Sequence, residues 1–230
     1  MPRSPRRDLY AVASMEIRPG IIARGPWELD QVAAHWSETH YEPPPDAVQA
    51  ADAAIAALRE RGSPSHDGLS GRLVALRASP TLLELDVQPI RWALRLNPTD
   101  ASQSMAAMCV VRSSDGSWLV GQRAAWVASW PGRWALGAGG SVDAGESPAE
   151  TLGRELAEEW SVQAERTTVE ALLCLPNRVI LFVGMAWLAQ GATVTRDSEH
   201  DDHAWWPAEP DRWPAHADAS VREIGALLAR

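Results

Sequence analysis

The sequence contains no lysine, so all 21 of its basic side chains are arginines, and 30 acidic residues outnumber them. The net charge of −9 argues against a nucleic-acid partner, because proteins that bind phosphate backbones usually carry a basic stripe and none is visible here. The absence of lysine itself indicates no function, since with so much alanine it reflects genome base composition as much as physics. We therefore expect no nucleic-acid partner.

Cysteine and long apolar runs are scarce as well. Cys109 and Cys174 each stand in an apolar run typical of a strand, where a thiol usually packs as a small hydrophobe. We expect no disulfide framework. No run of about 18 apolar residues occurs, which excludes a membrane-spanning helix, and acidic residues interrupt the N-terminal segment where a signal peptide needs an apolar core. We expect a cytoplasmic protein without a membrane partner.

The chain does contain enough apolar sequence for a core, at 46% of 230 residues, which suits one good-sized domain or two small ones. A short extended stretch is expected at residues 9–17. Helical spacing of apolar residues predicts helices over residues 28–36 and 46–61. Two β-like runs, at residues 72–78 and 81–87, predict an antiparallel pair of strands.

We place a domain boundary near residue 100, because the apolar pattern becomes more regular beyond it. The run at 177–189 is long and almost wholly apolar, as a central buried strand should be. The elements expected in this second part are strands at 104–113, 117–125, 168–175, 177–189 and 204–206, and a terminal helix at 220–229.

The most informative stretch spans residues 140–162, GSVDAGESPAETLGRELAEEWSV. Ser147 precedes Pro148, and Glu150 follows Ser147 by three positions, which is the pattern of a capping box with proline at the first helical position. We therefore expect a helix to begin at Ser147. Leu152 and Leu156 fall on one side of this helix and give it a buried stripe.

Three glutamates share the adjoining face of the same helix. Glu155, Glu158 and Glu159 are separated by steps of three and four, so their carboxylates emerge together. Because like charges at these spacings destabilise a helix, the arrangement favours a cation among them. Oxygen ligands suit Mg²⁺ or Mn²⁺ better than Zn²⁺. A solvated acidic helix face is the alternative that the helix alone leaves open.

The spacing of the fixed residues in this stretch closely resembles the Nudix box, the metal-binding loop and helix of the Nudix hydrolases. Six fixed positions at fixed spacing arise by chance in a chain this long about once in ten thousand or more rarely. Ser161 departs from the family, in which a glycine ends the helix in a left-handed conformation. The resemblance covers roughly residues 104–206, with Gln122-Arg123 and Pro131–Trp134 preceding the box. The six fixed positions are Gly140, Glu146, Arg154, Glu155, Glu158 and Glu159, and Leu156 and Val162 also match the box.

The resemblance implies an α/β/α sandwich around a mixed sheet, an α+β fold, for a Nudix domain at residues 101–230. A small α+β domain at residues 1–100 precedes it. This first part resembles, in outline, the extension of the Nudix proteins that hydrolyse UDP-sugars. A layer that completes the core, or a contact in a homodimer, is the alternative role for it.

The resemblance implies that Glu155, Glu158 and Glu159 bind one or more Mg²⁺ or Mn²⁺ ions, which bridge oxygens of a diphosphate. Arg154 and Glu146 support the ligands without binding the metal, because ligating carboxylates need outer hydrogen bonds to hold their geometry. Arg154 would orient a glutamate on the preceding loop. Gly139 and Gly140 let the backbone approach the substrate, and a plain turn is the alternative for both glycines.

The remaining site residues follow from the segments around the box. Glu199 is the favoured general base and Asp202 the next, with a solvated acidic loop as the alternative for both; His200 and His203 could also act as bases. The catalytic set is thus Glu158, Glu159 and Glu199. The residues expected to contact substrate are Gly139, Gly140, Arg123, Trp130 and Trp134, the tryptophans because an indole can stack on a base or cap a sugar.

The function implied is metal-dependent hydrolysis of a diphosphate bond in a nucleoside diphosphate linked to another moiety, by attack of water on phosphorus. A nucleotide sugar is slightly favoured as the substrate by the resemblance of the first part of the chain. The alternative is a non-catalytic Nudix domain that senses a nucleotide. A third activity with this fold, isopentenyl-diphosphate isomerase, needs a cysteine in a motif that neither Cys109 nor Cys174 provides.

Overall fold

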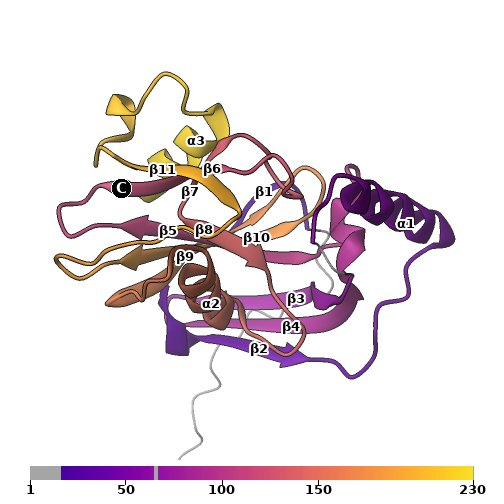
Figure 1. Ribbon diagram of the computed structural model, residues 1–230. Coiled ribbons are helices and arrows are strands. Elements are labelled where there is room, and N and C mark those ends of the chain that lie inside the picture. The colour runs from indigo at the N-terminus through magenta and orange to yellow at the C-terminus, as the bar shows by residue number, and fades with distance from the viewer. Residues whose placement is uncertain (1–16, 65–66, 230) are drawn as a thin grey trace, which may run out of the picture.

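The structure, a computed structural model, describes residues 17–64 and 67–229 and is built on a large mixed sheet (Figure 1). The strand order is β1-β9-β10-β5-β6-β11, with β7 paired to β6 and β8 paired to β5. In the described part of this sheet, β10 and β5 run parallel and the other pairs are antiparallel. The strands are β1 (Gly20–Glu28), β5 (Met105–Arg112), β6 (Trp118–Arg123), β7 (Trp134–Leu136), β8 (Ala138–Ser141), β9 (Arg166–Cys174), β10 (Ile180–Trp187) and β11 (His200–Trp206).

Two helices cover opposite faces of this sheet. Leu152, Leu156 and Trp160 of α2 (Pro148–Trp160) pack into one buried cluster with side chains of β6, β9 and β10. Val221 of α3 (Ala219–Leu228) belongs to a second cluster with Val110 and Val183. Figure 1 shows α2 and α3 on the two sides of the strands. The predicted sandwich around a mixed sheet is therefore confirmed.

A second, three-stranded sheet comes from the first part of the chain, in the order β2-β4-β3. Helix α1 buries Ala51, Ile55 and Leu58 against η2, a 3-10 helix. The predictions of a helix at 46–61 and of an antiparallel pair at 72–87 are confirmed. The elements are η1 (Leu29–Gln31), β2 (Val32–Trp36), α1 (Pro45–Glu60), β3 (Leu69–Ser79), β4 (Leu82–Arg91) and η2 (Trp92–Leu96).

The two sheets share one core, and β3 runs beside the loop that leads into α2. Leu73, Leu83 and Leu85 of the small sheet belong to the same buried cluster as Leu152. The amide of Gly71 donates to the Val142 carbonyl at 2.8 Å, and β1 forms an edge of the large sheet against β9. A division into two domains near residue 100 stays a prediction.

Several expected elements differ in the structure. The helix predicted over residues 28–36 is wrong, because η1 and β2 occupy this segment and β2 pairs in parallel with β4. The strands predicted at 104–113 and 117–125 are present as β5 and β6, which pair with each other at Arg112 and Trp118, while β8 pairs with β5 and β7 with β6. The extended stretch expected at 9–17 lies, except for Ile17, outside the described residues.

The helix α2 begins and ends as its local sequence dictates. Ser147 Oγ accepts a hydrogen bond from the amide of Glu150, and the Glu150 carboxylate accepts one from the amide of Ser147, which completes the predicted capping box. Ser161 follows the last turn at φ 51°, in the left-handed region that a glycine would occupy at lower cost. The position thus keeps the expected backbone although its residue differs.

Cys109 and Cys174 are buried free thiols, as expected for small hydrophobes in strands. Burial raises the pKa of the Cys109 thiol to about 12. Among the described helices, none is long and apolar enough to cross a membrane.

Candidate functional site

The strand β8 places two glycines beside glutamates of α2. Gly139 and Gly140 lie opposite Met108 and Ala107 of β5, so they belong to a strand and not to a plain turn. A Cβ atom added to Gly140 would collide with the carboxylate of Glu155. The bare backbone at this position therefore makes the room in which that carboxylate lies.

Two of the three helix glutamates are buried. Glu155 is 8% exposed and Glu159 is 3% exposed. Burial raises the pKa of Glu155 to about 7, although Arg154 opposes the shift. Burial also raises the pKa of Glu159 well above its ordinary value, against the opposing charge of Arg123. In contrast, 60% of the Glu158 side chain is exposed. The acidic face is thus divided into two buried carboxylates and one exposed carboxylate.

Arg154 connects the helix to the loop before it. Its Nε and Nη2 donate to the two carboxylate oxygens of Glu146 at 2.7 and 3.0 Å, and its Nη2 also donates to the Ser141 carbonyl at 3.0 Å. Its Nη1 donates to Glu155 at 2.8 Å and to Glu158 at 3.1 Å. The hydrogen bond with Glu146 is the largest cause of the raised pKa of Arg154. These hydrogen bonds join the loop that carries Glu146 to α2, and the role of Arg154 in the site stays a prediction.

A second arginine joins Glu159 to the favoured base candidate. Arg123, at the end of β6, donates to Glu199 at 2.9 Å through Nη2 and to Glu159 at 3.4 Å through Nη1. The Gly139 amide donates to the same Glu159 oxygen at 3.3 Å. The structure therefore brings Glu199 to the glutamates of α2. Asp202 is exposed, and its carboxylate accepts a hydrogen bond from the His203 amide.

His200 is a buried neighbour of Glu159 that sequence reasoning named only as one of several bases. Its Nε2 lies 3.7 Å from Glu159 Oε2, and its Nδ1 lies 3.2 Å from Asp197. Its ring lies 4.6 Å from that of Trp160. Burial lowers the pKa of His200, as does Arg123, while Asp197 opposes the shift. The absence of a side chain at Gly121 leaves room for the ring, and no local pattern in the sequence signals this contact.

Trp130 and Trp134 lie in the cluster beneath α3, whereas the glutamates belong to α2. The Trp134 ring lies 6.0 Å from that of Trp206 and 5.7 Å from that of His216. The guanidinium of Arg133 lies 5.0 Å from the Trp130 ring. Contact of either tryptophan with substrate stays a prediction.

The donor set of the site fits a hard divalent cation. Glu159 Oε2 is buried without a hydrogen-bond partner, and so is His200 Nε2, which lies 3.7 Å from it. A buried carboxylate oxygen without a hydrogen bond is costly unless a cation or proton satisfies it. Glu155 adds a second buried carboxylate, and oxygen ligands are those that Mg²⁺ and Mn²⁺ prefer. In the part of the chain that the structure describes, no three His, Cys, Asp or Glu side chains are grouped as a metal cage, and Arg154 donates hydrogen bonds to both Glu155 and Glu158.

The first part of the chain also reaches this site, which the sequence did not predict. Trp92 and Arg95 of η2 both donate hydrogen bonds to Ser141 Oγ, the Trp92 bond at 2.7 Å. Ser141 directly follows Gly140 at the end of β8. Contacts between segments this far apart depend on the packing of the two sheets.

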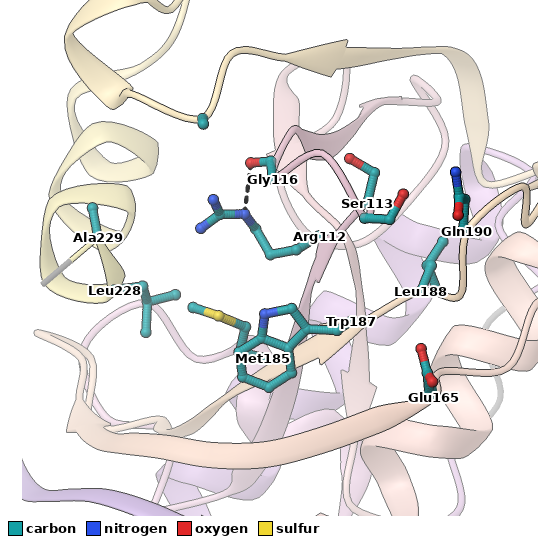
Figure 2. Close-up of a pocket in the computed structure, with 12 residues that line it drawn as sticks. Arg112, Ser113, Gly116, Glu165, Met185, Trp187, Leu188, Gln190, Leu228 and Ala229 are labelled. Carbon is teal, nitrogen blue, oxygen red and sulfur yellow. Dashed lines mark hydrogen bonds between the residues drawn. The ribbon is translucent and has the colours of Figure 1, made fainter.

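A separate cavity of about 680 Å³ lies between the ends of β5 and β10 and the end of α3 (Figure 2). Figure 2 shows the Arg112 guanidinium pointing into it above Trp187 and Met185, with the Nε of Arg112 bonded to the Gly116 carbonyl at 2.9 Å. The guanidinium also lies 4.1 Å from the Trp118 ring. The site residues predicted from the sequence are absent from the lining of this cavity.

Comparison with known proteins gives one family and several similar structures. A family model described as the NUDIX domain matches residues 103–220. No curated protein matches the chain. A MutT protein from Methanosarcina mazei is 23% identical, with 54% of this chain and 90% of that protein covered and a TM-score of 0.45. An Ap4A hydrolase from C. elegans is 25% identical, with 54% and 92% covered and a TM-score of 0.42. The NUDIX domain of Shewanella oneidensis NrtR, complexed with ADP ribose, is 19% identical, with 54% and 85% covered and a TM-score of 0.44.

Proposed function

Because the chain belongs to the Nudix family of hydrolases, whose domain model matches residues 103–220, we propose that it is a metal-dependent diphosphatase. Its substrate is a nucleoside diphosphate linked to another moiety, and the resemblance of its first part to UDP-sugar hydrolases favours a nucleotide sugar. The single observation that carries the proposal is the buried, unpartnered Oε2 of Glu159, beside a second buried carboxylate on the helix of the box.

A Mg²⁺ or Mn²⁺ ion, when bound, neutralises charge on the diphosphate and lowers the pKa of a bound water. Glu155 and Glu159 would hold it from the buried side and Glu158 from the exposed side. Their raised pKa values, which are due first to burial, support this assignment, because a cation relieves the cost of two carboxylates in one apolar setting.

The other charged residues position the reacting groups. Arg154 fixes Glu146, Glu155 and Glu158 through hydrogen bonds of 2.7 to 3.1 Å, which holds the loop and the helix in one arrangement. Arg123 holds Glu199 beside Glu159. We assign Glu199 as the base: the oxygen of water bonds to phosphorus, the P–O bond to the leaving phosphate breaks, and the proton of the water passes to the Glu199 carboxylate.

The test is phosphate release, after phosphatase coupling, from nucleotide sugars, ADP-ribose, dinucleoside polyphosphates, CoA and dNTPs with Mg²⁺ or Mn²⁺. The variant Glu159→Gln removes the charge at nearly constant shape, and Glu165→Gln, at an exposed position lining the separate cavity, is the matched control. We expect metal-dependent turnover of one substrate class, a loss of about 100-fold or more in Glu159→Gln, as for other electrostatic groups in active sites, and no change in the control. Folded protein that binds nucleotide but turns over nothing would contradict the proposal and favour the nucleotide-sensing alternative.

A further inference from the structure

Arg95, which comes from the first part of the chain, is connected by contacts to the glutamates of α2. Arg95 Nη1 donates to Ser141 Oγ, and the Ser141 carbonyl accepts a hydrogen bond from Arg154. Gly140, the residue before Ser141, lies against the carboxylate of Glu155. The chain of contacts therefore runs from η2 to the buried glutamate in three steps.

Arg95 differs from the other two arginines of the site in what it binds. Arg154 is committed to Glu146, Glu155 and Glu158. Arg123 is committed to Glu159 and Glu199. Within residues 17–64 and 67–229, Arg95 has no carboxylate in an ion pair, and its hydrogen bond is to a neutral hydroxyl. Among these three arginines of the described chain, Arg95 is the one that forms no ion pair with a carboxylate.

The guanidinium of Arg95 is nonetheless held in place and partly withdrawn from water. Its side chain is half-buried, and its guanidinium lies 5.7 Å from the Trp92 ring. Burial lowers the pKa of Arg95, the charge of Arg123 lowers it further, and the charge of Glu155 opposes the shift. The three charged groups are therefore close enough to interact electrostatically. Within the described residues, the hydrogen bond of the Arg95 guanidinium is the one from Nη1 to Ser141. Its Nε and Nη2 are absent from the buried atoms that lack a partner, so solvent reaches them and a ligand could bind there.

A fixed, partly desolvated guanidinium with spare donors is the group that proteins use to bind phosphate oxygens, because its planar fork matches two oxygens at once. The other two arginines of the site are already paired with its five glutamates, whereas the substrate is itself an anion. We propose that Arg95 binds a phosphate oxygen of the diphosphate, so that the first part of the chain completes the substrate site of the second. This inference rests on the proposed function.

The experiment separates binding of phosphate from binding of metal. Isothermal titration calorimetry measures the affinity for Mn²⁺ alone and then, at saturating Mn²⁺, for methylenediphosphonate, whose P–C–P bridge cannot be hydrolysed. The variants are Arg95→Gln, Arg95→Lys and, as the control, Arg112→Gln. Arg112 is also half-buried, bonded to a neutral oxygen and near a tryptophan ring, but it lies in the separate cavity of Figure 2.

We expect Arg95→Gln to weaken diphosphonate binding about 10- to 100-fold, the range for a lost charge-assisted hydrogen bond. The affinity for Mn²⁺ should stay the same or rise, because a positive charge near Glu155 is removed. Arg95→Lys should restore part of the loss, and Arg112→Gln should change neither affinity. A variant Ser141→Ala, which keeps the guanidinium, should bind the diphosphonate within about 3-fold of wild type, since it removes one neutral hydrogen bond.

Two results would overturn the inference while leaving the proposed function intact. In the first, wild type binds both ligands and Arg95→Gln binds the diphosphonate equally well. In the second, Arg95→Gln loses Mn²⁺ and diphosphonate affinity by the same factor, as expected if Arg95 only holds the Ser141 loop. Wild-type protein that binds neither ligand would overturn the proposed function and this inference together.

Discussion

In the metal-free protein, Glu155→Gln should change the free energy of unfolding in a pH-dependent way. The value for the variant minus the value for wild type should be larger at pH 8 than at pH 5. Glu155 is 8% exposed, and burial raises its pKa from 4.5 to about 7. The native state therefore binds the proton of Glu155 more tightly than the unfolded state does. By linkage, the contribution of this group to the free energy of unfolding is complete below about pH 4.5 and decreases as the pH rises to about 7.

The size of this change follows from the pKa values. One pKa unit corresponds to about 1.4 kcal/mol, so the interval from 4.5 to about 7 amounts to roughly 3 kcal/mol of unfolding free energy. Glutamine is neutral at every pH and loses none of it. The difference at any single pH also contains the altered hydrogen bond with Arg154, which is 2.8 Å long in wild type, so the pH-dependent part of the difference is the quantity to measure.

The assay is urea unfolding followed by tryptophan fluorescence between pH 5 and pH 8, first in EDTA and then with Mg²⁺. Mg²⁺ at 100 times its dissociation constant should stabilise wild type by about 2.7 kcal/mol and the variant much less. Glu165→Gln, at an exposed position, is the control and should follow wild type at every pH. Parallel stability curves for wild type and Glu155→Gln, or equal stabilisation of both by Mg²⁺, would refute the reasoning.

Three further substitutions test other parts of the structure. Gly140→Ala should lower the affinity for Mn²⁺ by about 10-fold or more, because the new Cβ displaces the Glu155 carboxylate. Gly153→Ala on α2, where a Cβ atom meets open space, should leave that affinity unchanged and raise the free energy of unfolding by about 0.5–1 kcal/mol. Equal metal affinities in the two variants would contradict the first expectation. Ser161→Gly should stabilise the fold to urea by about 0.5–1 kcal/mol, because the residue stands at φ 51°, and a loss of stability would show that the serine relieves its own strain. Trp134→Ala should destabilise the fold by about 2 kcal/mol, since it removes part of a cluster, and leave KM within about 2-fold; a raised KM at unchanged stability would instead support the predicted contact with substrate.

The parts of the fold that the sequence predicted correctly are those specified by neighbouring residues. Ser147, Pro148 and Glu150 determine where α2 begins through contacts within one turn. The run at 177–189 is apolar enough to require burial on both faces, and β10, a central strand between β9 and β5, has buried side chains on both faces. Both inferences needed only local chemistry, and for this reason both could be made without the structure.

The segment at 28–36 shows where such reasoning fails. Leu29, Val32, Ala33 and Trp36 fit a helical period, but Leu29 is 37% exposed, and Val32 and Trp36 lie in a strand that pairs with β4. Pairing between distant strands overrides a four-residue pattern, since strand formation depends on the neighbours of the strand more than on its own residues. The strand β1 was missed for the same reason, because its partner β9 lies more than a hundred residues away.

The candidate site was predictable to the extent that it lies within the box. The sequence placed the glutamates on one face, but it could not show that two are buried and one is exposed, because that division depends on β8 and on Gly140 in particular. It suggested Glu199 from a loop composition, whereas the contact with Arg123 depends on the pairing of β11 with β6. Arg95 lay outside every pattern, because only tertiary packing places it near Ser141.

These contacts bear on what the first part of the chain does. The strand β1 covers the edge of β9, and the amides of Gly71 and Leu73 in β3 bond to carbonyls of Val142 and Gln103 on the far side of the predicted boundary. Without this part, the edge of β9 would lose its partner and Ser141 would lose the hydrogen bonds from η2. The Ser141 carbonyl, at the end of β8, also accepts a hydrogen bond from Arg154, so contacts from both sides of residue 100 meet beside the glutamates. The first part of the chain therefore contributes contacts to the site, and a domain boundary near residue 100 stays a prediction.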